Sequence, residues 1–299
     1  MDNFSFTLAK ILRRIKPMSS VSRKYNVYRH KKIMGKLQPF FDRALMNAKN
    51  TQNSIPQKKK VIWLFWWQGI EEMPPLVLKC YKSILKYRGS YQVIVITKDN
   101  IHEYAALPSY IYDKVAQQEI TLTHLSDILR FNLLSQYGGL WMDSTLFVTG
   151  SLDQIRIDQL FTCSGYDSNN MFNVSAGRWT GFLIGGPSNL EIFIFMNEFF
   201  LNYWETNDSL LDYFLIDYAL NFAWLNNLSS LQNISYANQN VDPQMFKLED
   251  LLNETFSKSV ASRLLNDTFI FKLSNRQPVN LNDKQNFYNH LESLQVEGY

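Results

Sequence analysis

The chain has 299 residues, a length that accommodates one large or two small domains. Apolar side chains make up 46% of it and aromatic ones 15%, which is enough to build a substantial core. Its two cysteines, Cys80 and Cys163, do not make a disulfide framework, and we expect both in the core. The four histidines lack metal-ligand spacing, so no zinc site is expected.

The net charge of +3 is unevenly distributed along the chain. Residues 1–60 hold 15 Lys and Arg against only Asp2 and Asp42, a net charge of +13, so the remainder carries −10. A basic arm on an acidic body predicts contact with an anionic surface. Because no zinc, RRM or helix-turn-helix signature accompanies this charge, we expect no nucleic-acid partner.

The first segment favours a membrane as that surface. Apolar residues recur there at helical spacing, with basic residues beside the stripe and Pro17 after it: Phe4, Leu8, Ile11, Leu12 and Ile15 against Lys10, Arg13, Arg14 and Lys16. This pattern is typical of a short helix lying in a membrane interface. The alternative is a helix that packs on its own domain and exposes a solvated basic face.

The basic residues also bear on the cellular location. Lys10, Arg13 and Arg14 interrupt any apolar core of a signal peptide, and no stretch is long enough to span a bilayer. We therefore expect a cytoplasmic protein, peripheral to the inner face of the plasma membrane.

The elements predict two units in chain order. Residues 1–56 form a basic helical arm, and residues 57–299 form the main domain. In that domain strands at 61–66 and 91–97 flank a helix at 76–87, which describes a βαβ unit with parallel pairing. Further expected elements are a short helical region at 101–115 broken by Pro108, strands at 159–163, 181–185 and 270–273, and helices at 190–203 and 286–294.

The most informative stretch is Ser126-Asp127-Ile128-Leu129-Arg130, followed by Tyr137-Gly138-Gly139-Leu140-Trp141-Met142-Asp143. It predicts a helix, a glycine stop and a buried strand that ends on a carboxylate. Asp127 and Arg130 lie three residues apart, so both point from one helix face. Because ligands of open α/β sheets bind outside the carboxyl ends of strands, these groups suit the ribose and diphosphate of a nucleotide sugar.

These motifs resemble the glycosyltransferase family that contains bacterial capsular polysaccharide synthesis proteins, related to the sugar-binding transferases with an Asp-x-Asp motif. The similarity extends over about residues 60–225. It includes Ile62-Trp63 and Trp66-Trp67-Gln68-Gly69 at the first strand, Pro74-Pro75 and Cys80-Tyr81-Lys82-Ser83 in the next helix, and Asp212-Tyr213-Phe214-Leu215-Ile216-Asp217 on the acceptor side.

The resemblance implies an α/β fold of the GT-A nucleotide-sugar-binding type, with a mixed, mainly parallel sheet and an N-terminal helical arm. It implies a hexosyltransferase that moves a sugar from a nucleoside diphosphate sugar, expected to be UDP-linked, with retention of configuration. The expected acceptor is a lipid-linked capsular or exopolysaccharide repeat unit. Two alternatives stay open: a non-catalytic sugar-nucleotide or glycan-binding protein, and a membrane-surface scaffold.

The resemblance also assigns site residues. Asp127, Arg130 and Asp143 are expected to bind the donor, whereas the alternative for the first two is a surface ion pair. Trp67 is expected to stack on the base. Ser144 and Thr145 add hydroxyl contacts, and Lys272 and Ser274 close the donor site. Asp212 and Asp217, two acids expected in a helix of otherwise apolar character, are the candidate catalytic residues; the alternatives are a helix N-cap and an ion pair.

One departure concerns the metal. Where related enzymes carry Asp-x-Asp, this chain has Asp143-Ser144-Thr145, so Asp143 is the only carboxylate of the motif left as a Mn²⁺ or Mg²⁺ ligand. A threonine hydroxyl is a poor ligand for a hard cation. We therefore predict weak or partial metal dependence, with Arg and Lys side chains neutralising part of the diphosphate charge.

Overall fold

The computed structural model describes residues 3–14, 19–51, 59–165, 171–237 and 242–294. Five strands form its central sheet, in the order β2-β1-β3-β6-β5. The three strands β2, β1 and β3 are parallel, whereas β6 is antiparallel to β3 and to β5. The strands are β1 (Val61–Phe65), β2 (Gln92–Ile96), β3 (Gly139–Met142), β5 (Phe161–Thr162) and β6 (Leu183–Gly186).

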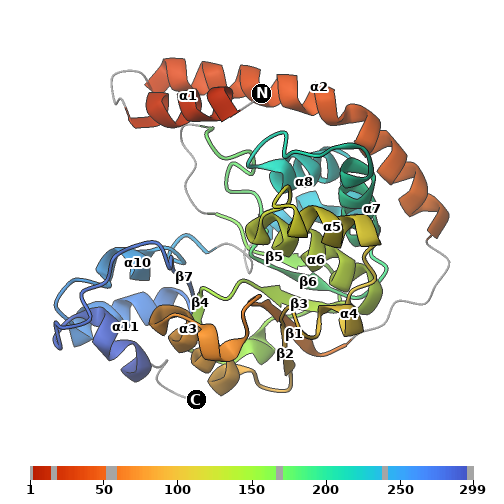
Figure 1. Cartoon of the computed structure of the whole chain (residues 1–299). Coiled ribbons are helices and arrows are strands. Elements are labelled where there is room, and N and C mark those ends of the chain that lie inside the picture. The colour runs from red at the N-terminus through yellow and green to blue at the C-terminus, as the bar shows by residue number, and fades with distance from the viewer. Residues whose placement is uncertain (1–2, 15–18, 52–58, 166–170, 238–241, 295–299) are drawn as a thin grey trace.

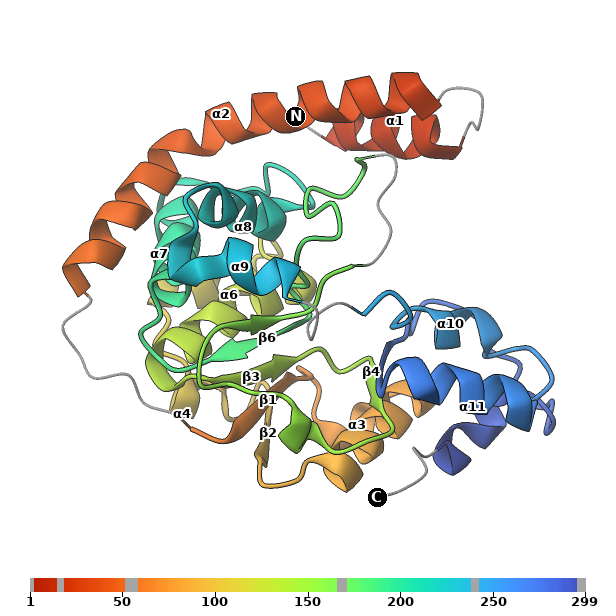
Figure 2. The same ribbon diagram turned by 180° about the vertical axis from the view of Figure 1, so that it is seen from behind.

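Strand β1 is buried along its whole length, which explains its uninterrupted apolar sequence. Side chains of successive residues point to opposite faces of a sheet. Trp63 belongs to the larger core, whereas Ile62 and Leu64 belong to a second core on the other face. That second face is covered by α3 (Pro75–Tyr87), which contributes Ile84. The sheet is therefore sandwiched between helices (Figure 2).

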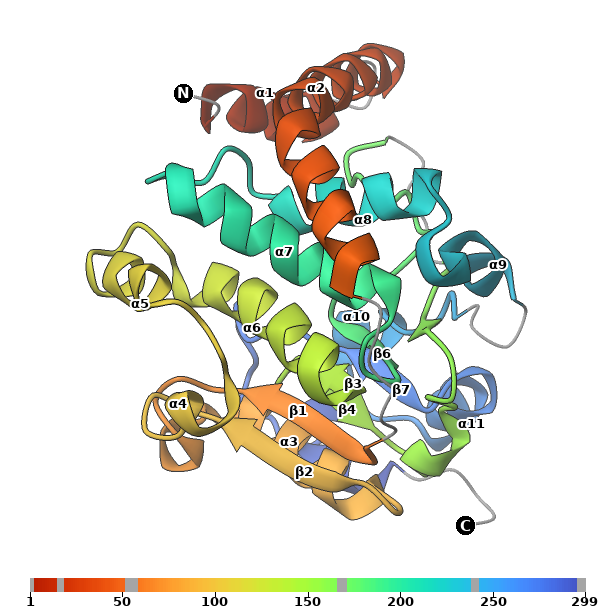
Figure 3. The same ribbon diagram turned by 90° about the vertical axis from the view of Figure 1, so that its right-hand side faces the viewer.

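The larger core lies between the sheet and a layer of helices. Figure 3 shows α6 and α7 between the strands and the long α2. The helices of this side are α4 (Ile101–Tyr104), α5 (Ser109–Ala116), α6 (Leu122–Tyr137), α7 (Glu191–Thr206), α8 (Leu215–Leu225) and α9 (Leu231–Tyr236). Short 3-10 turns occur at η2 (Ile70–Glu72), η3 (Leu152–Gln154) and η4 (Leu228–Ser230).

The N-terminal arm consists of two helices, α1 (Asn3–Arg14) and α2 (Ser19–Thr51), which lie along one side of the molecule (Figure 1). The inner side of α2 is part of the larger core: Leu37 and Phe41 are fully buried, and Phe41 stacks on Phe199 at 5.1 Å and on Phe222 at 4.8 Å. Burying one such phenylalanine contributes about 1.5–3 kcal/mol. Residues 52–58 lie outside the described residues, so the boundary between the arm and the main domain at residue 56 stays a prediction.

A small C-terminal lobe completes the fold. Strands β4 (Leu146–Val148) and β7 (Ile270–Lys272) form a separate antiparallel pair, in which Leu146 faces Lys272. Around this pair lie α10 (Lys247–Leu251), α11 (Lys258–Asp267) and the 3-10 helix η6 (Phe287–Ser293). Because of this pairing, Lys272 of β7 lies close to the end of β3.

The structure confirms the predicted fold class: a mixed α/β protein whose sheet begins with parallel strands, preceded by a helical arm. One local prediction is wrong. Asp212 was expected within a helix, but α8 begins at Leu215, so Asp212 lies in the turn before it. No helix among the described residues has the length and apolar character needed to cross a membrane.

Candidate active site at the end of strand β3

The turn between α6 and β3 depends on two glycines. Gly138 has φ 66° and Gly139 has φ 102°, conformations that side-chain-bearing residues rarely adopt. A Cβ on Gly138 would lie 2.5 Å from the backbone nitrogen of Ser188, and one on Gly139 would lie 2.6 Å from Val61. This tight turn brings α6 back against its own strand. Arg130 on the helix thereby reaches Asp143 just beyond the strand end.

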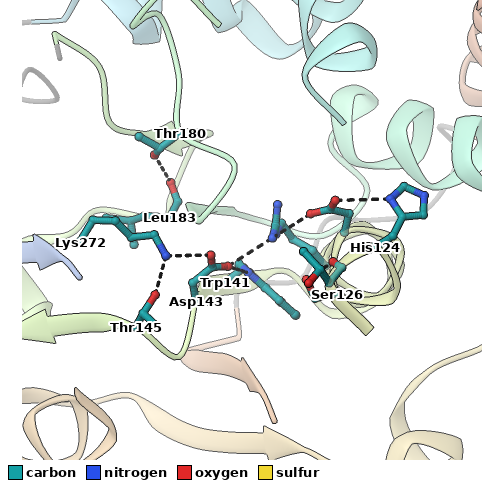
Figure 4. Close-up of polar contacts among 11 residues, drawn as sticks. His124, Ser126, Trp141, Asp143, Thr145, Thr180, Leu183 and Lys272 are labelled. Atoms are coloured by element: carbon teal, nitrogen blue, oxygen red, sulfur yellow. Dashed lines mark hydrogen bonds and ion pairs between the residues drawn. The ribbon is translucent and has the colours of Figure 1, made fainter. Parts of the chain in front are cut away.

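Asp143 lies between two cations. Its Oδ1 is 3.2 Å from Arg130 Nη2 and accepts a hydrogen bond from Trp141 Nε1 at 3.0 Å, while its Oδ2 is 3.2 Å from Lys272 Nζ (Figure 4). Burial alone would raise the pKa of Asp143, but the charges of Lys272 and Arg130 outweigh it and lower the pKa below its usual value. Asp143 is therefore a carboxylate at neutral pH.

Lys272 joins the site from the C-terminal lobe. Because β7 pairs with β4, Lys272 lies opposite Leu146, and its Nζ also donates to Thr145 Oγ1 at 2.5 Å (Figure 4). Its side chain is 20% exposed, so the ammonium group faces the pocket described below rather than the core. An ammonium group thus bridges the first and third positions of Asp143-Ser144-Thr145.

Asp127 extends the network on the other side of Arg130. Its carboxylate is 3.2 Å from Arg130 Nη2 and 3.5 Å from His124 Nδ1. Trp204 Nε1 donates to His124 Nε2 at 2.9 Å, so Nε2 must be the unprotonated ring nitrogen and Nδ1 carries the proton toward Asp127. The predicted pair of Asp127 and Arg130 is therefore linked to Asp143, and it is more than an isolated surface ion pair.

A pocket of about 670 Å³ opens over this network. That volume lies within the range typical of ligand sites. Six predicted residues line it: Trp67, Asp143, Ser144, Thr145, Lys272 and Ser274. Another cavity, of about 440 Å³ and lined by residues such as Arg156 and Asp242, contains none of the predicted residues.

The aromatic wall of the pocket comes from the loop after β1. Trp66 and Trp67 both line it and are partly buried. The lining also includes Tyr213 and Phe246, two aromatic residues that the sequence analysis does not assign to the site. Trp67, predicted as the base-stacking residue, thus lies in the pocket beside a second tryptophan that could serve the same purpose.

Arg130 and Asp127 lie behind the pocket wall. The Arg130 side chain is 4% exposed, and its guanidinium packs 5.1 Å from the Trp141 ring. A Cβ on Gly181 would lie 3.0 Å from Arg130 Nη1, so glycine at 181 leaves room for the guanidinium. The structure therefore brings Asp127, Arg130 and Asp143 together, with Asp143 nearest the pocket.

The two candidate catalytic acids have different surroundings. Asp217 Oδ1 accepts a hydrogen bond from Trp179 Nε1 at 2.9 Å. Burial raises the pKa of Asp217 to about 6; the negative charge of Asp127 adds to the rise, while the Trp179 hydrogen bond and Arg130 oppose it. Asp217 is thus coupled electrostatically to the network, although it does not line the pocket.

Asp212 has a structural partner instead. Its carboxylate is fully buried, forms an ion pair with Arg29 of α2, and accepts the Phe214 N–H at 3.0 Å. It is not among the residues that line the pocket. The geometry therefore gives Asp212 the task of joining the arm to the turn before α8, and it offers no support for contact with a sugar.

Glu249 and Arg276 of the C-terminal lobe also line the pocket. Glu249 of α10 accepts the backbone N–H of Ser274 at 2.8 Å, and burial raises its pKa. Its Oε1 is buried and has no hydrogen-bond partner among the residues that the structure describes. Ser274 Oγ in turn accepts the Arg276 N–H at 3.2 Å. Glu249 was missed because nothing in its helical stretch distinguishes it from a solvent-exposed acid.

The donor atoms do not fit a divalent cation well. No cluster of three or more His, Cys, Asp and Glu residues suited to a metal occurs within the described part of the chain. Asp143 is the one carboxylate of its motif, and both of its oxygens already contact cationic side chains. A Mg²⁺ ion is usually held by one or two carboxylates together with substrate phosphates and waters, so here it would depend on Asp143 and would compete with Lys272 and Arg130 for the oxygens of that carboxylate.

Comparison with known proteins identifies the family of the chain. The model of the family described as "capsular polysaccharide synthesis protein" matches residues 13–291, and among curated proteins none matches the sequence. The family description is consistent with a role in capsular polysaccharide synthesis. Since the match covers nearly the whole chain, including every residue of the pocket, this chain belongs to the capsular polysaccharide synthesis protein family.

Proposed function

We propose that this protein is a glycosyltransferase that uses a nucleoside diphosphate sugar, with UDP as the expected nucleotide. The observation that supports it best is the alignment of Asp143, Lys272 and two tryptophans in one pocket at the carboxyl end of β3. A tryptophan face suits a base, a carboxylate suits ribose hydroxyls, and an ammonium group suits a diphosphate. All three chemistries are needed for such a donor.

In the proposed complex the base stacks on Trp67 or Trp66, and Asp143 accepts hydrogen bonds from the ribose. Arg130 holds Asp143 in place from behind and keeps it ionised. This differs from the expected direct contact of Arg130 with sugar or phosphate, because its guanidinium is buried between two carboxylates. Arg130 is in this proposal a positioning residue.

Lys272 is proposed to supply the charge that a metal ion supplies in Asp-x-Asp enzymes. Its Nζ contacts Asp143 and Thr145, the two positions that flank the central residue of the motif. When the glycosidic bond to the diphosphate breaks, negative charge accumulates on the leaving phosphate. A preorganised cation at that point stabilises the transition state and needs no further ligands.

Asp217 remains the candidate acid on the acceptor side. It does not line the pocket, and its electrostatic coupling to Asp127 and Arg130 links it to the network behind the pocket wall. The proposed acceptor is a lipid-linked repeat unit of a capsular or exopolysaccharide. Retention of configuration stays part of the proposal, supported only by the family resemblance.

A sugar-transfer assay tests the proposal. Thermal-shift measurements with UDP, GDP, CMP and dTDP sugars identify the donor, because a ligand that binds the folded state raises the melting temperature. The identified donor is then incubated with membrane extracts or short lipid-linked acceptors, and transfer and donor hydrolysis are followed. Binding of a nucleotide sugar without transfer or hydrolysis would favour the alternative of a non-catalytic binding protein.

A further inference from the structure

The outer side of α2 carries an unusual combination of side chains. Helical spacing places Val21, Lys24, Tyr28 and Lys31 on one face, flanked by Val27 and Lys32; we call these six residues the outer face of α2. All six are exposed, with Tyr28 at 64% and Val27 at 49%. In Figures 1, 2 and 3 no element among the described residues covers this side, and α1 and α8 lie on the other side of this part of α2.

The charge of this region has one sign. Between residues 3 and 41 the sequence contains no Asp or Glu. Among the described side chains of the stretch the buried cation is Arg29, which is paired with Asp212, whereas Lys24, Lys31 and Lys32 extend toward solvent. Because these lysines are exposed and the stretch contains no acidic residue, the outer face attracts anionic groups from outside the chain.

The packing of α1 supports the alternative expectation that the first helix packs on its own domain. Phe6 stacks on Tyr213 at 5.4 Å and on Phe172 at 5.9 Å, and Ala9 is fully buried. Among the described side chains of the predicted apolar stripe, Leu8 and Leu12 are partly buried and Ile11 is 51% exposed. The first helix is therefore attached to the body, and Ile11 is a further exposed apolar side chain of the arm.

We infer that the outer face of α2 docks the protein on an anionic lipid membrane. Lysines near such a surface gain attraction from its negative potential, and exposed Val, Ile and Tyr side chains gain by entering the headgroup region. A soluble polyanion would engage the lysines but would give the valines and Ile11 no favourable contact. The mixture of the two kinds of side chain thus favours a bilayer.

The arm also contacts the lining of the pocket. Phe6 stacks on Tyr213, and Tyr213 lines the pocket that contains Asp143. Docking through α2 would therefore hold the pocket mouth at a fixed position relative to the lipid surface. The link to a lipid-linked acceptor rests on the proposed transferase function, but binding to vesicles does not, so the two can fail separately.

Vesicle sedimentation with the full-length protein tests the inference. With about 30 mol% phosphatidylglycerol in phosphatidylcholine we expect strong binding at low salt, little binding to pure phosphatidylcholine, and release at high salt. Each lysine near the surface is worth about a fivefold change in partitioning. The triple variant Lys24→Glu, Lys31→Glu, Lys32→Glu should therefore lower partitioning by a hundredfold or more.

Matched controls decide between explanations. The variant Lys258→Glu, Arg263→Glu, Lys284→Glu changes the net charge equally but alters exposed residues of the C-terminal lobe, and it should bind almost as the wild type does. Val27→Ser with Tyr28→Ser should weaken binding severalfold without a change in charge. Equal loss in the lobe variant would mean that net charge alone acts. Undiminished binding of the serine variant, together with tight binding to soluble heparin, would mean that the surface serves a polyanion and would overturn the membrane assignment.

Discussion

Replacing Lys272 by methionine tests the central electrostatic claim. At 3.2 Å, the Nζ–Oδ2 distance to Asp143, two unit charges attract by about 5 kcal/mol at an effective dielectric constant of about 20. The 20% exposure of the side chain screens part of this attraction, so it is a ceiling. Removing one preorganised charge stabiliser from an enzyme site typically costs about 10²- to 10³-fold in kcat.

We therefore expect Lys272→Met to lower kcat by about 10²- to 10³-fold, with a smaller effect on KM. Methionine preserves most of the volume, and Asp143 keeps Arg130 and Trp141 as partners, so the melting temperature should fall only modestly. Lys258→Met, at an exposed position on α11, is the matched control and should leave kcat unchanged. Initial rates of transfer at saturating donor provide the measurement.

A second variant tests whether Lys272 stands in for a metal. Combining Lys272→Ala with Thr145→Asp removes the ammonium group and restores two carboxylates at Asp-x-Asp spacing. That variant should be nearly inactive in EDTA and should regain activity with Mn²⁺, whereas the wild type should change little. If EDTA eliminates wild-type activity and micromolar Mn²⁺ restores it, or if Lys272→Met turns over at nearly the wild-type rate, the reasoning is refuted.

Three further predictions concern the carboxylates. Asp143→Asn should abolish transfer while the circular dichroism spectrum stays unchanged, and near wild-type turnover would contradict donor binding by this residue. The pKa of Asp217 is raised to about 6 in the folded state, so the folded protein binds a proton at this carboxylate more tightly than the unfolded chain does between pH 4 and 6. The free energy of unfolding should therefore fall by roughly 3 kcal/mol as pH rises through that window. Asp217→Asn should remove this slope in denaturant titrations at several pH values, and an unchanged slope would exclude Asp217 as its source. Asp212→Asn should lower the free energy of unfolding by about 3–5 kcal/mol, because it leaves the charge of Arg29 buried without its partner. The folded variant should keep its kcat, and a specific loss of kcat would restore Asp212 as a catalytic candidate.

Local chain geometry explains which parts of the site the sequence could predict. Asp127, Arg130 and Asp143 lie within seventeen consecutive residues, joined by a single glycine turn, so helix periodicity and strand direction suffice to bring them together. The βαβ start of the sheet was predictable for the same reason. Trp67 follows the same strand, β1, that the pattern identified.

Long-range packing decided the rest. Asp212 was a catalytic candidate because it is an acid in an apolar stretch. Its burial is explained by its ion pair with Arg29, which lies 183 positions away, so no local sequence pattern connects the two residues. The sequence left open whether the first helix contacts a membrane or packs on its own domain, and the packing side chain, Phe6, lies outside the apolar stripe that the spacing identified. Glu249 entered the pocket through the packing of α10 against β7, which has no signature in sequence.

The charges around the pocket impose a further constraint on the proposed donor complex. Asp127, Arg130, Asp143 and Lys272 form an alternating row of two negative and two positive groups, so the row is neutral before a diphosphate arrives. Arg130 is enclosed by both carboxylates, which leaves Lys272 as the cation of the row that can turn toward the diphosphate. Asp143 then relies on Arg130 alone, and the negative charge near Asp217 increases. A group whose pKa is already about 6 responds to added negative charge by binding a proton, so donor binding and protonation of Asp217 should favour each other. Donor binding would thus be linked to the protonation of Asp217 through electrostatics rather than through direct contact, because Asp217 does not line the pocket.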